Sequence, residues 1–308
     1  MKPRIAVLLP CYNEEAAIGQ TVAAFRAALP DATIYVYDNN SRDRTVEVAR
    51  AAGAVVRTER MQGKGHVVRR MFADVDADVF VMADGDATYD ADAVPAMVGR
   101  LVDEQLDMVV GTRIEQHVEA YRRGHRLGNR LLTGILARLF GRSFTDIFSG
   151  YRVFSRRFVK SFPVLSSGFE IETEISVHAL ELRMPVAELE TRYFARPEGS
   201  ASKLSTYRDG LRIARTIATL YRNERPMLFF GWIAALLAGA ALLLSIPLVL
   251  TYLDTGLVPR FPTAILATGL MILAALNLFT GLILDTVVRG RREMRRLAYL
   301  AYSIHWLA

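Results

Sequence analysis

The chain has 308 residues, of which 52% are hydrophobic, and this is enough for one complete α/β domain with further apolar material beside it. Its single cysteine, Cys11, excludes an internal disulfide and fits a reducing compartment. The net charge of +6 fits a membrane surface. A nucleic-acid partner is not expected, because the sequence lacks a basic motif interleaved with aromatic residues.

The first part of the chain alternates short apolar runs with helical patterns. The first apolar run is too short for a signal peptide, so we expect it to be a strand. Strands are predicted at residues 5–9, 33–37, 54–57, 79–83 and 108–112, and helices at residues 14–28 and 43–52. This strand–helix–strand rhythm predicts an α/β domain with a doubly wound, mostly parallel sheet.

The fourth of these strands ends in two aspartates. Asp84 and Asp86 follow the apolar, β-branched run and are one residue apart. Alternate strand residues point the same way, and open α/β sheets bind ligands at the carboxyl edge. Two carboxylates at that edge suit Mg²⁺ or Mn²⁺ bridging a diphosphate. A polar turn that closes the strand is the simpler interpretation of the pair taken alone.

Polar residues also follow the first two strands, at 10–15 and 38–45. Turn formation and helix capping would explain Ser41, Asp43 and Thr45 singly. They do not explain why successive strands deliver carboxylates to one edge. Between them, Lys64 stands between two glycines, which let backbone approach a phosphate closely. The segment lacks the P-loop pattern.

Two segments in the C-terminal third contain no charged residue, 226–253 and 261–284. Each is long enough to cross a bilayer as a helix, whereas two buried soluble helices in succession would need a very large core. The flanks of this pair are rich in arginine, and the loop between the segments carries only Arg260. The positive-inside rule therefore predicts that both flanks, both termini and the N-terminal domain are cytoplasmic.

The predicted organisation has four parts. They are an α/β domain at 1–205, a juxtamembrane amphipathic helix at 206–225, a two-helix transmembrane hairpin at 226–288 and a cytoplasmic basic tail at 289–308. The amphipathic helix is predicted because apolar residues between 211 and 221 alternate with arginines, and we expect it to lie in the membrane interface. A soluble surface helix is the alternative.

Residues 4–205 resemble family 2 glycosyltransferases with a GT-A fold. Four segments carry the resemblance: 9–15 (LPCYNEE), 38–45 (DNNSRDRT), 63–65 (GKG) and 84–86 (DGD). Later segments are similar to the branch that glycosylates polyprenyl phosphates, which includes dolichyl-phosphate mannose and glucose synthases: 111–113 (GTR), 146–152 (DIFSGYR), 168–174 (GFEIETE) and 196–203 (RPEGSASK). The sugar is not identified by these motifs.

The resemblance implies a role for each matching residue. The donor nucleotide would be bound by Pro10, Tyr12, Glu14, Asp38 and Lys64. Asp84 would approach the ribose or the metal shell, and Asp86 would ligate the metal at the diphosphate. Arg113 would contact the acceptor phosphate and Lys203 the donor diphosphate, which makes Asp86, Arg113 and Lys203 the catalytic set. Dolichyl-phosphate mannose synthases usually add a glutamine ligand where this chain has Thr88, so the metal preference stays open.

Such a transfer does not require a strong general base. A lipid phosphate has a second pKa of about 6, so its oxygen is already an anion at neutral pH. The site must hold two anions together, and arginines suit this. Candidates for the acceptor phosphate precede an apolar segment at 131–140, namely Arg122, Arg126 and Arg130, although a basic solvated or membrane-facing surface would also explain them. Direct attack would invert the anomeric centre, because no nucleophile for retention is identified.

The sequence therefore predicts an inverting enzyme of the inner membrane that moves a sugar from a nucleotide donor to undecaprenyl phosphate or a similar lipid. UDP is favoured over GDP, and a homo-oligomer is left open. A processive polysaccharide synthase is the alternative enzyme, but the Gln-x-x-Arg-Trp motif is absent. A non-catalytic, membrane-anchored scaffold that binds sugar nucleotides is the second alternative. No role follows for Glu170, Glu172, Glu174, His178 or Asp285.

Overall fold

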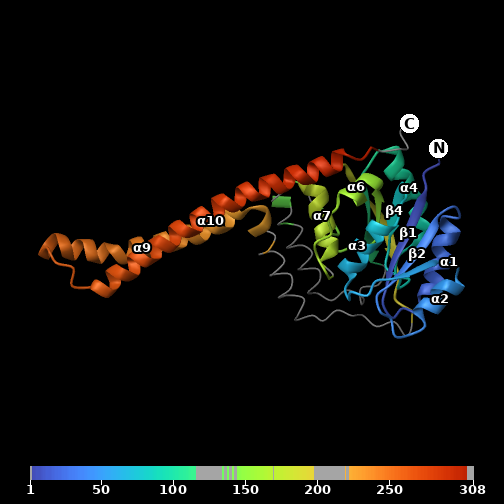
Figure 1. Ribbon diagram of the computed structural model, residues 1–308, viewed down its shortest axis with the longest axis horizontal. Helices are drawn as coiled ribbons and strands as arrows, with labels where there is room; N and C mark the ends of the chain where they lie inside the picture. The colour runs from blue at the N-terminus through green and yellow to red at the C-terminus, as the bar shows by residue number, and fades with distance from the viewer. Residues whose placement is uncertain are drawn as a thin grey trace. The chain divides into compact units, whose positions relative to one another are not determined.

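The computed structural model describes residues 2–115, 134, 137–138, 141, 144–168, 170–197, 219 and 222–303 (Figure 1). The chain divides into two compact units. Residues 1–213 and 294–308 form one, called here the sheet unit, and residues 214–293 form the other, called the hairpin unit.

The sheet unit is built on a seven-stranded sheet in the order β3-β2-β1-β4-β6-β5-β7. The strands are β1 (Ile5–Cys11), β2 (Thr33–Asp38), β3 (Val55–Thr58), β4 (Val79–Met82), β5 (Met108–Glu115), β6 (Arg152–Ser155) and β7 (Val186–Tyr193). Neighbouring strands are parallel except at β6, which is antiparallel to both β4 and β5. The doubly wound, mostly parallel sheet predicted from the sequence is confirmed, while β6 and β7 were not predicted.

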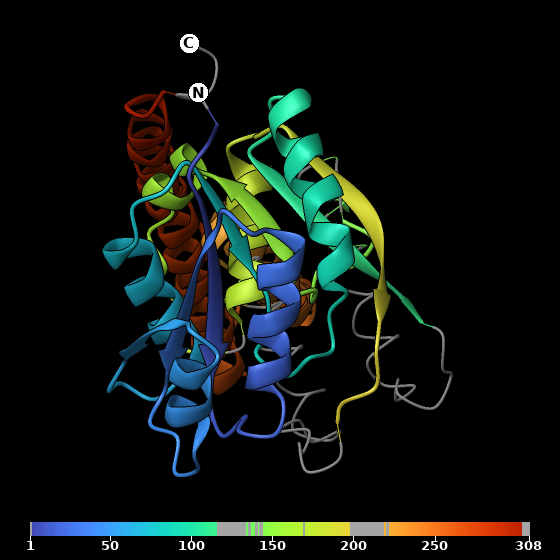
Figure 2. The ribbon, with the colours of Figure 1, turned by 90° about the vertical axis from the view of Figure 1, so that its right-hand side faces the viewer.

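Helices cover both faces of the sheet. They are α1 (Ile18–Ala28), α2 (Thr45–Ala51), α3 (Lys64–Asp74), the 3-10 turn η1 (Ala91–Ala93), α4 (Val94–Asp103), α6 (Arg156–Ser161) and α7 (Ile171–Glu181). Figure 1 places α1, α2 and α4 on one side of the sheet and α3, α6 and α7 on the other, in agreement with their mutual contacts. Figure 2 shows α1 and α4 side by side in front of the strands.

The local sequence explains several of these boundaries. All four residues of β4 are buried, as expected for a central strand covered on both faces. Ser155 caps the start of α6, because its side chain accepts a hydrogen bond from the Phe158 backbone N–H at 3.1 Å. α1 begins at Ile18, four residues later than the pattern at Glu14 indicated, because residues 14–17 form turns at the carboxyl edge.

The hairpin unit contains α9 (Pro226–Thr255) and most of α10 (Phe261–Leu300). Both are long and apolar enough to cross a membrane, as the sequence predicted, and α10 extends well beyond the apolar segment that ends at residue 284. Buried small or β-branched residues recur every seven positions along the pair: Ala234 and Ala241 in α9, and Ala267, Ala274, Gly281 and Val288 in α10. Small residues allow helix backbones to approach closely, so this seam holds the hairpin together.

Gly281 marks the tightest point of that seam. A Cβ atom added there would lie 3.3 Å from the Phe230 Cβ and 3.5 Å from the Met227 Cα. Most large apolar side chains of both helices face outward instead, and Leu236 is 70% exposed within the chain. An apolar outer surface with a small-residue seam is the pattern of helices that pack in lipid.

The last described turns of α10 belong to the sheet unit. The Tyr299 hydroxyl donates to Asp107 Oδ2 at 2.7 Å, and the Arg157 guanidinium lies 4.7 Å from the centre of the Tyr299 ring. Asp107 is fully buried and also accepts from Arg157 and from the Ser155 hydroxyl. Donors from three residues thus offset the cost of burying this carboxylate. The same contacts fix the end of α10 at the start of β5.

His178 of α7 makes the stability of the sheet unit depend on pH. Its ring is 2% exposed, packs against Phe158 and Phe162, and lies 3.4 Å from the Ser161 hydroxyl. Burial, with a smaller effect of the Arg295 charge, lowers the pKa of His178 to about 3. Protonation therefore favours the unfolded chain, where an imidazole has a pKa of about 6.5.

We predict that this contribution to stability is fully present above about pH 6.5 and is lost as the pH falls toward about 3. Between about pH 7.5 and about pH 5, His178 should account for a loss of about 2 kcal/mol in the free energy of unfolding. Thermal unfolding of the wild type and of His178→Gln at both pH values would measure it. An equal pH dependence in both proteins would contradict the prediction.

Candidate functional site

Three parallel strands deliver polar residues to one edge of the sheet. In the register of the strands, Cys11 of β1 pairs with Asp38 of β2, and Leu8 of β1 pairs with Met82 of β4. The segments that follow β1, β2 and β4 therefore begin side by side. The convergence expected from the sequence is present in the structure.

The segments after β1 and β2 are joined by side-chain to backbone hydrogen bonds. The Thr45 hydroxyl accepts from the Glu14 backbone N–H at 2.8 Å, and the Ser41 hydroxyl accepts from the Asn13 backbone N–H at 2.8 Å. Asp38 is 4% exposed and accepts from the Ser41 backbone N–H. Ser41 and Thr45 thus shape the predicted nucleotide pocket, in which Asp38 ends β2 and Glu14 lies in the segment that follows the neighbouring strand β1.

Asn39 organises the approach to Lys64, a role that sequence reasoning missed. Its side-chain amide donates to the backbone carbonyls of Glu59 and Met61 at 2.9 and 2.8 Å. Its carbonyl oxygen accepts from the Gly63 backbone N–H at 2.7 Å. A single amide therefore satisfies three backbone groups of the 59–63 loop. The run of asparagines at 39–40 was the available signal, because asparagine is a residue that pairs with turn backbone.

Lys64 lies between two carboxylates. Its ammonium is 2.5 Å from Asp84 Oδ1 and 2.6 Å from Glu172 Oε1, and the side chains of Lys64 and Glu172 are buried. Burial lowers the pKa of the Lys64 ammonium, but the charges of Asp84 and Glu172 raise it by more, so the lysine is charged. The sequence predicted Lys64 and Asp84 at the donor site but assigned no role to Glu172.

Asp86 has a protein donor on each oxygen. The Thr88 hydroxyl donates to Oδ1 at 2.6 Å, and Arg196 pairs with Oδ2 at 2.7 Å. Between them, Ala87 has a φ of 57°, in the left-handed region, and this turn brings Thr88 back to Asp86. Burial and the Asp84 charge raise the pKa of Asp86, which is 3% exposed. A cation at this carboxylate would favour its charged form.

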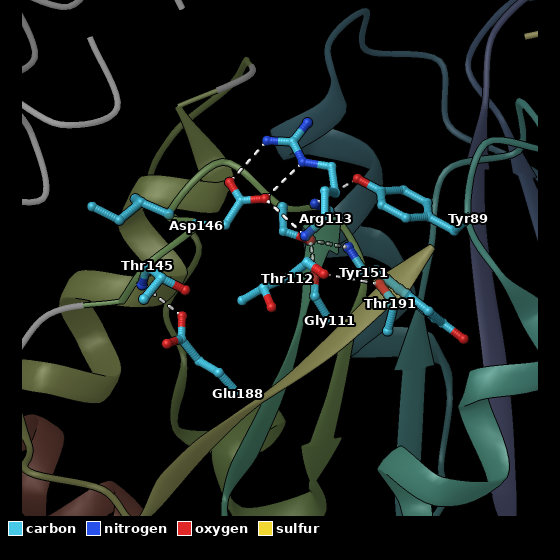
Figure 3. A network of polar contacts seen from close by, with 12 residues as sticks. Tyr89, Gly111, Thr112, Arg113, Thr145, Asp146, Tyr151, Glu188 and Thr191 are labelled. Atoms are coloured by element: carbon cyan, nitrogen blue, oxygen red, sulfur yellow. Dashed lines mark hydrogen bonds and ion pairs between the residues drawn. The ribbon is translucent and has the colours of Figure 1, made fainter. Parts of the chain in front are cut away.

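Arg113 is held by Asp146 through two hydrogen bonds. Arg113 Nε donates to Asp146 Oδ2 at 2.7 Å, and a terminal nitrogen donates to Oδ1 at 2.8 Å (Figure 3). The guanidinium carbon also lies 5.4 Å from the centre of the Tyr193 ring. Figure 3 shows that the loop carrying Asp146 is tied to β7, where Glu188 accepts from the Thr145 backbone N–H at 2.7 Å. Arg113 is therefore fixed in orientation.

The carboxylates at this edge fit a divalent cation that a substrate helps to bind. Among the described residues, no group of three or more His, Cys, Asp or Glu side chains surrounds a common point. Mg²⁺ and related ions are commonly held by one or two carboxylates together with substrate phosphates rather than by an all-protein cage. Asp86, with Asp84 nearby, has that donor set.

Four of the predicted site residues lie outside the part of the chain that the structure describes. They are Arg122, Arg126, Arg130 and Lys203. The apolar segment at 131–140 and the amphipathic helix at 206–225 also lie mostly outside it. Their assignments stay predictions.

Comparison with known proteins gives concordant results. Residues 6–162 match the family described as glycosyl transferase family 2. The chain is 30% identical to glycosyltransferase AglJ of Haloferax volcanii, over 96% of this chain and 98% of AglJ. It is 28% identical to the dolichyl-phosphate hexose transferase of the same organism, over 72% of this chain and 95% of that protein.

Solved structures agree with the sheet topology. Glucosyl-3-phosphoglycerate synthase from Mycobacterium tuberculosis, in complex with Mn²⁺, UDP and glucosyl-3-phosphoglycerate, superimposes with a TM-score of 0.59 at 24% identity. The match covers 71% of this chain and 79% of the synthase. It confirms the GT-A type of fold predicted from the sequence.

The glycines around Lys64 should be sensitive to substitution. A Cβ atom at Gly65 would lie 2.1 Å from the Ser166 carbonyl oxygen, whereas at Gly99, inside α4, the nearest atom is 4.0 Å away. We predict that Gly65→Ala lowers the free energy of unfolding by at least about 2 kcal/mol, because backbone must move. Gly99→Ala should raise it by about 0.5–1 kcal/mol through its helix propensity.

Thermal or denaturant unfolding of both variants checks this prediction. If Gly65→Ala is as stable as Gly99→Ala, the close packing of residues 63–65 against residues 166–167 does not hold the Lys64 loop.

Proposed function

Because the chain belongs to glycosyl transferase family 2 and is therefore a glycosyltransferase, we propose that it transfers a sugar from a UDP-sugar to a polyprenyl phosphate such as undecaprenyl phosphate. One observation carries the proposal. The same chain has two carboxylates, Asp84 and Asp86, at the carboxyl edge of its sheet and two apolar helices long enough to cross a membrane. The dolichyl-phosphate hexose transferase of Haloferax volcanii supports the lipid acceptor. The synthase complex with UDP and Mn²⁺ supports the donor and the metal.

The donor half of the mechanism rests on residues at the carboxyl edge. Pro10, Tyr12, Glu14 and Asp38 would line the base pocket, and Asp86 with Asp84 would hold Mg²⁺ or Mn²⁺ at the diphosphate. Such an ion, when bound, acts as a Lewis acid for the leaving diphosphate. Thr88 orients the Asp86 carboxylate through Oδ1, which leaves Oδ2 for exchange between Arg196 and an incoming cation.

The acceptor half requires fixed cations. Arg113 is pre-oriented by Asp146 and Tyr193, so its guanidinium can meet a phosphate with little further loss of side-chain entropy. Arg122, Arg126, Arg130 and Lys203 are proposed to contribute further positive charge. An acceptor phosphate that is ionised at neutral pH attacks directly, so the reaction inverts the anomeric centre and needs no general base.

The hairpin unit supports a membrane location. Trp232 and Tyr252 lie near the two ends of α9, and at the helical rise they are about 30 Å apart, the thickness of the hydrocarbon layer. Both are exposed in the chain, as residues of interfacial aromatic belts are. We propose a multi-pass protein of the cytoplasmic membrane with the sheet unit and both termini in the cytoplasm.

The function is tested with purified protein, radiolabelled nucleotide sugars and undecaprenyl phosphate. Label should become extractable into organic solvent with a UDP-sugar, in a reaction that depends on the lipid. Transfer of label only to water-soluble acceptors, or no lipid label with any nucleotide sugar, would overturn the proposal.

We predict that Asp86→Ala removes nearly all transfer activity, by at least about 100-fold, because the leaving diphosphate loses its metal. Asp92→Ala provides a control, since Asp92 is an exposed aspartate of η1. Mn²⁺ binding measured by electron paramagnetic resonance should be weakened only in Asp86→Ala. Undiminished turnover in excess EDTA would contradict the prediction.

We predict that Arg113→Ala raises the acceptor KM by about tenfold or more while nucleotide affinity changes little, because a charge-assisted contact to the acceptor phosphate is lost. Arg192→Ala is the control, since Arg192 is an exposed arginine of the neighbouring strand β7. Acceptor kinetics and UDP affinity are measured separately. Loss of UDP binding with normal acceptor kinetics would place Arg113 at the donor instead.

A further inference from the structure

Glu172 reaches the donor edge from a different part of the fold than Asp84 and Lys64. It lies in the first turn of α7, whereas Lys64 begins α3 and Asp84 follows β4. It is 5% exposed, and its carboxylate faces the Lys64 ammonium at 2.6 Å. A buried carboxylate costs free energy unless it is paired, so this contact is the reason that Glu172 can be buried there.

The Lys64 ammonium has more N–H groups than the two carboxylates beside it. An ammonium has three N–H donors, of which one donates to Asp84 Oδ1, and Glu172 forms an ion pair with the same ammonium. Among the residues that the structure describes, no third acceptor contacts this nitrogen. The ammonium is therefore held between two carboxylates, and its third N–H can meet an oxygen atom of a ligand.

Gly150 lets the backbone lie close to that ammonium. A Cβ atom at Gly150 would lie 3.3 Å from Lys64 Nζ, 3.1 Å from Asp84 Oδ2 and 3.3 Å from the Tyr89 hydroxyl. A side chain at this position would therefore crowd the ammonium, the carboxylate and the phenol.

The position of Glu172 is itself fixed by the backbone. Its carbonyl oxygen accepts from the buried Arg152 guanidinium at 3.2 Å and from the Ser176 hydroxyl at 2.9 Å. The start of α7 therefore cannot shift without breaking these contacts. Without Glu172, the flexible four-carbon stem of Lys64 would follow Asp84 alone.

We propose that Glu172 is a positioning residue for donor binding: it holds the Lys64 ammonium beside Asp84 and Gly150, so that the third N–H of Lys64 meets an oxygen of the nucleotide sugar. The inference rests on the proposed function, because it takes the donor edge to bind a nucleotide sugar. Glu172 itself touches no reacting atom. Its two neighbours, Lys64 and Asp84, make the contacts.

The test measures UDP affinity in the presence of Mn²⁺ by calorimetry, in full-length protein, without any acceptor. Glu172→Gln should weaken UDP binding about tenfold, because the lysine loses its second charged partner. Lys64→Met should weaken it more, because the donor contact is lost and two carboxylates face the anionic nucleotide. Unfolding temperatures show that each variant is folded.

The double variant Lys64→Met/Glu172→Gln distinguishes positioning from a general structural role. Once Lys64 is gone, the Glu172 carboxylate only repels the donor, so removing its charge should improve UDP binding relative to Lys64→Met. The effect of Glu172→Gln thus changes sign between the two backgrounds. A merely structural Glu172 would give the same loss in both.

Glu181→Gln is the matched control. Glu181 lies at the other end of α7, is buried, and pairs with Arg295, so the same substitution breaks a buried ion pair of the same helix away from the donor edge. It should leave UDP affinity unchanged. If Glu172→Gln weakens UDP binding equally in both backgrounds, or does not weaken it in the wild-type background, the inference is wrong. The proposed UDP-sugar donor stands in that case, because the wild type binds UDP. A wild type that binds no UDP would overturn both.

Discussion

The site depends on one buried guanidinium. Arg152, at the start of β6, is fully buried and donates to the carbonyl oxygens of Ile147, Ser149 and Glu172 and to the Ser176 hydroxyl. Burial lowers the pKa of Arg152 to about 10, so the group stays protonated at neutral pH. A buried charge costs several kcal/mol unless its donors are satisfied, and here loop and helix backbone satisfy them.

The two segments that Arg152 joins each carry a carboxylate of the site. The loop that follows residue 144 brings Asp146 to Arg113, and the first turn of α7 brings Glu172 to Lys64. Arg113 and Lys64 are therefore oriented by partners with a common support. Because Arg152 bonds mainly to backbone, it fixes the positions of these elements without competing for the carboxylates.

Asp84, Asp86, Lys64 and Arg113 each have a counter-charge in the protein. Asp86 pairs with Arg196, Arg113 with Asp146, and Lys64 with two carboxylates. Without such pairs, folding would leave buried charges uncompensated. Binding of an anionic donor with a divalent cation then exchanges one set of partners for another. This explains how a site that is proposed to hold two anions can belong to a stable fold.

Much of this arrangement could be predicted from the sequence, and the part that could not has a physical cause. The β4 strand and Asp84 and Asp86 were predictable because an apolar run that ends in carboxylates is a local pattern. The helices of the hairpin unit were predictable for the same reason. No roles were predicted for Glu172 and Arg196. Their partners are distant in the chain, so no local sequence pattern indicates the pairing. The short β6 begins with a charged residue, which conceals a buried strand.

The position of Thr88 shows how one residue can alter the proposed metal site without removing it. Where a glutamine side chain could reach a cation directly, the Thr88 hydroxyl bonds to Asp86 Oδ1 at 2.6 Å, so it acts on the carboxylate. The second oxygen, Oδ2, pairs with Arg196, and a cation that binds there would take the place of Arg196. A cation bound through so few protein ligands must complete its shell with water and with the donor diphosphate. Cation and nucleotide should therefore strengthen each other's binding more here than in a site built from several protein ligands, since each supplies what the other lacks.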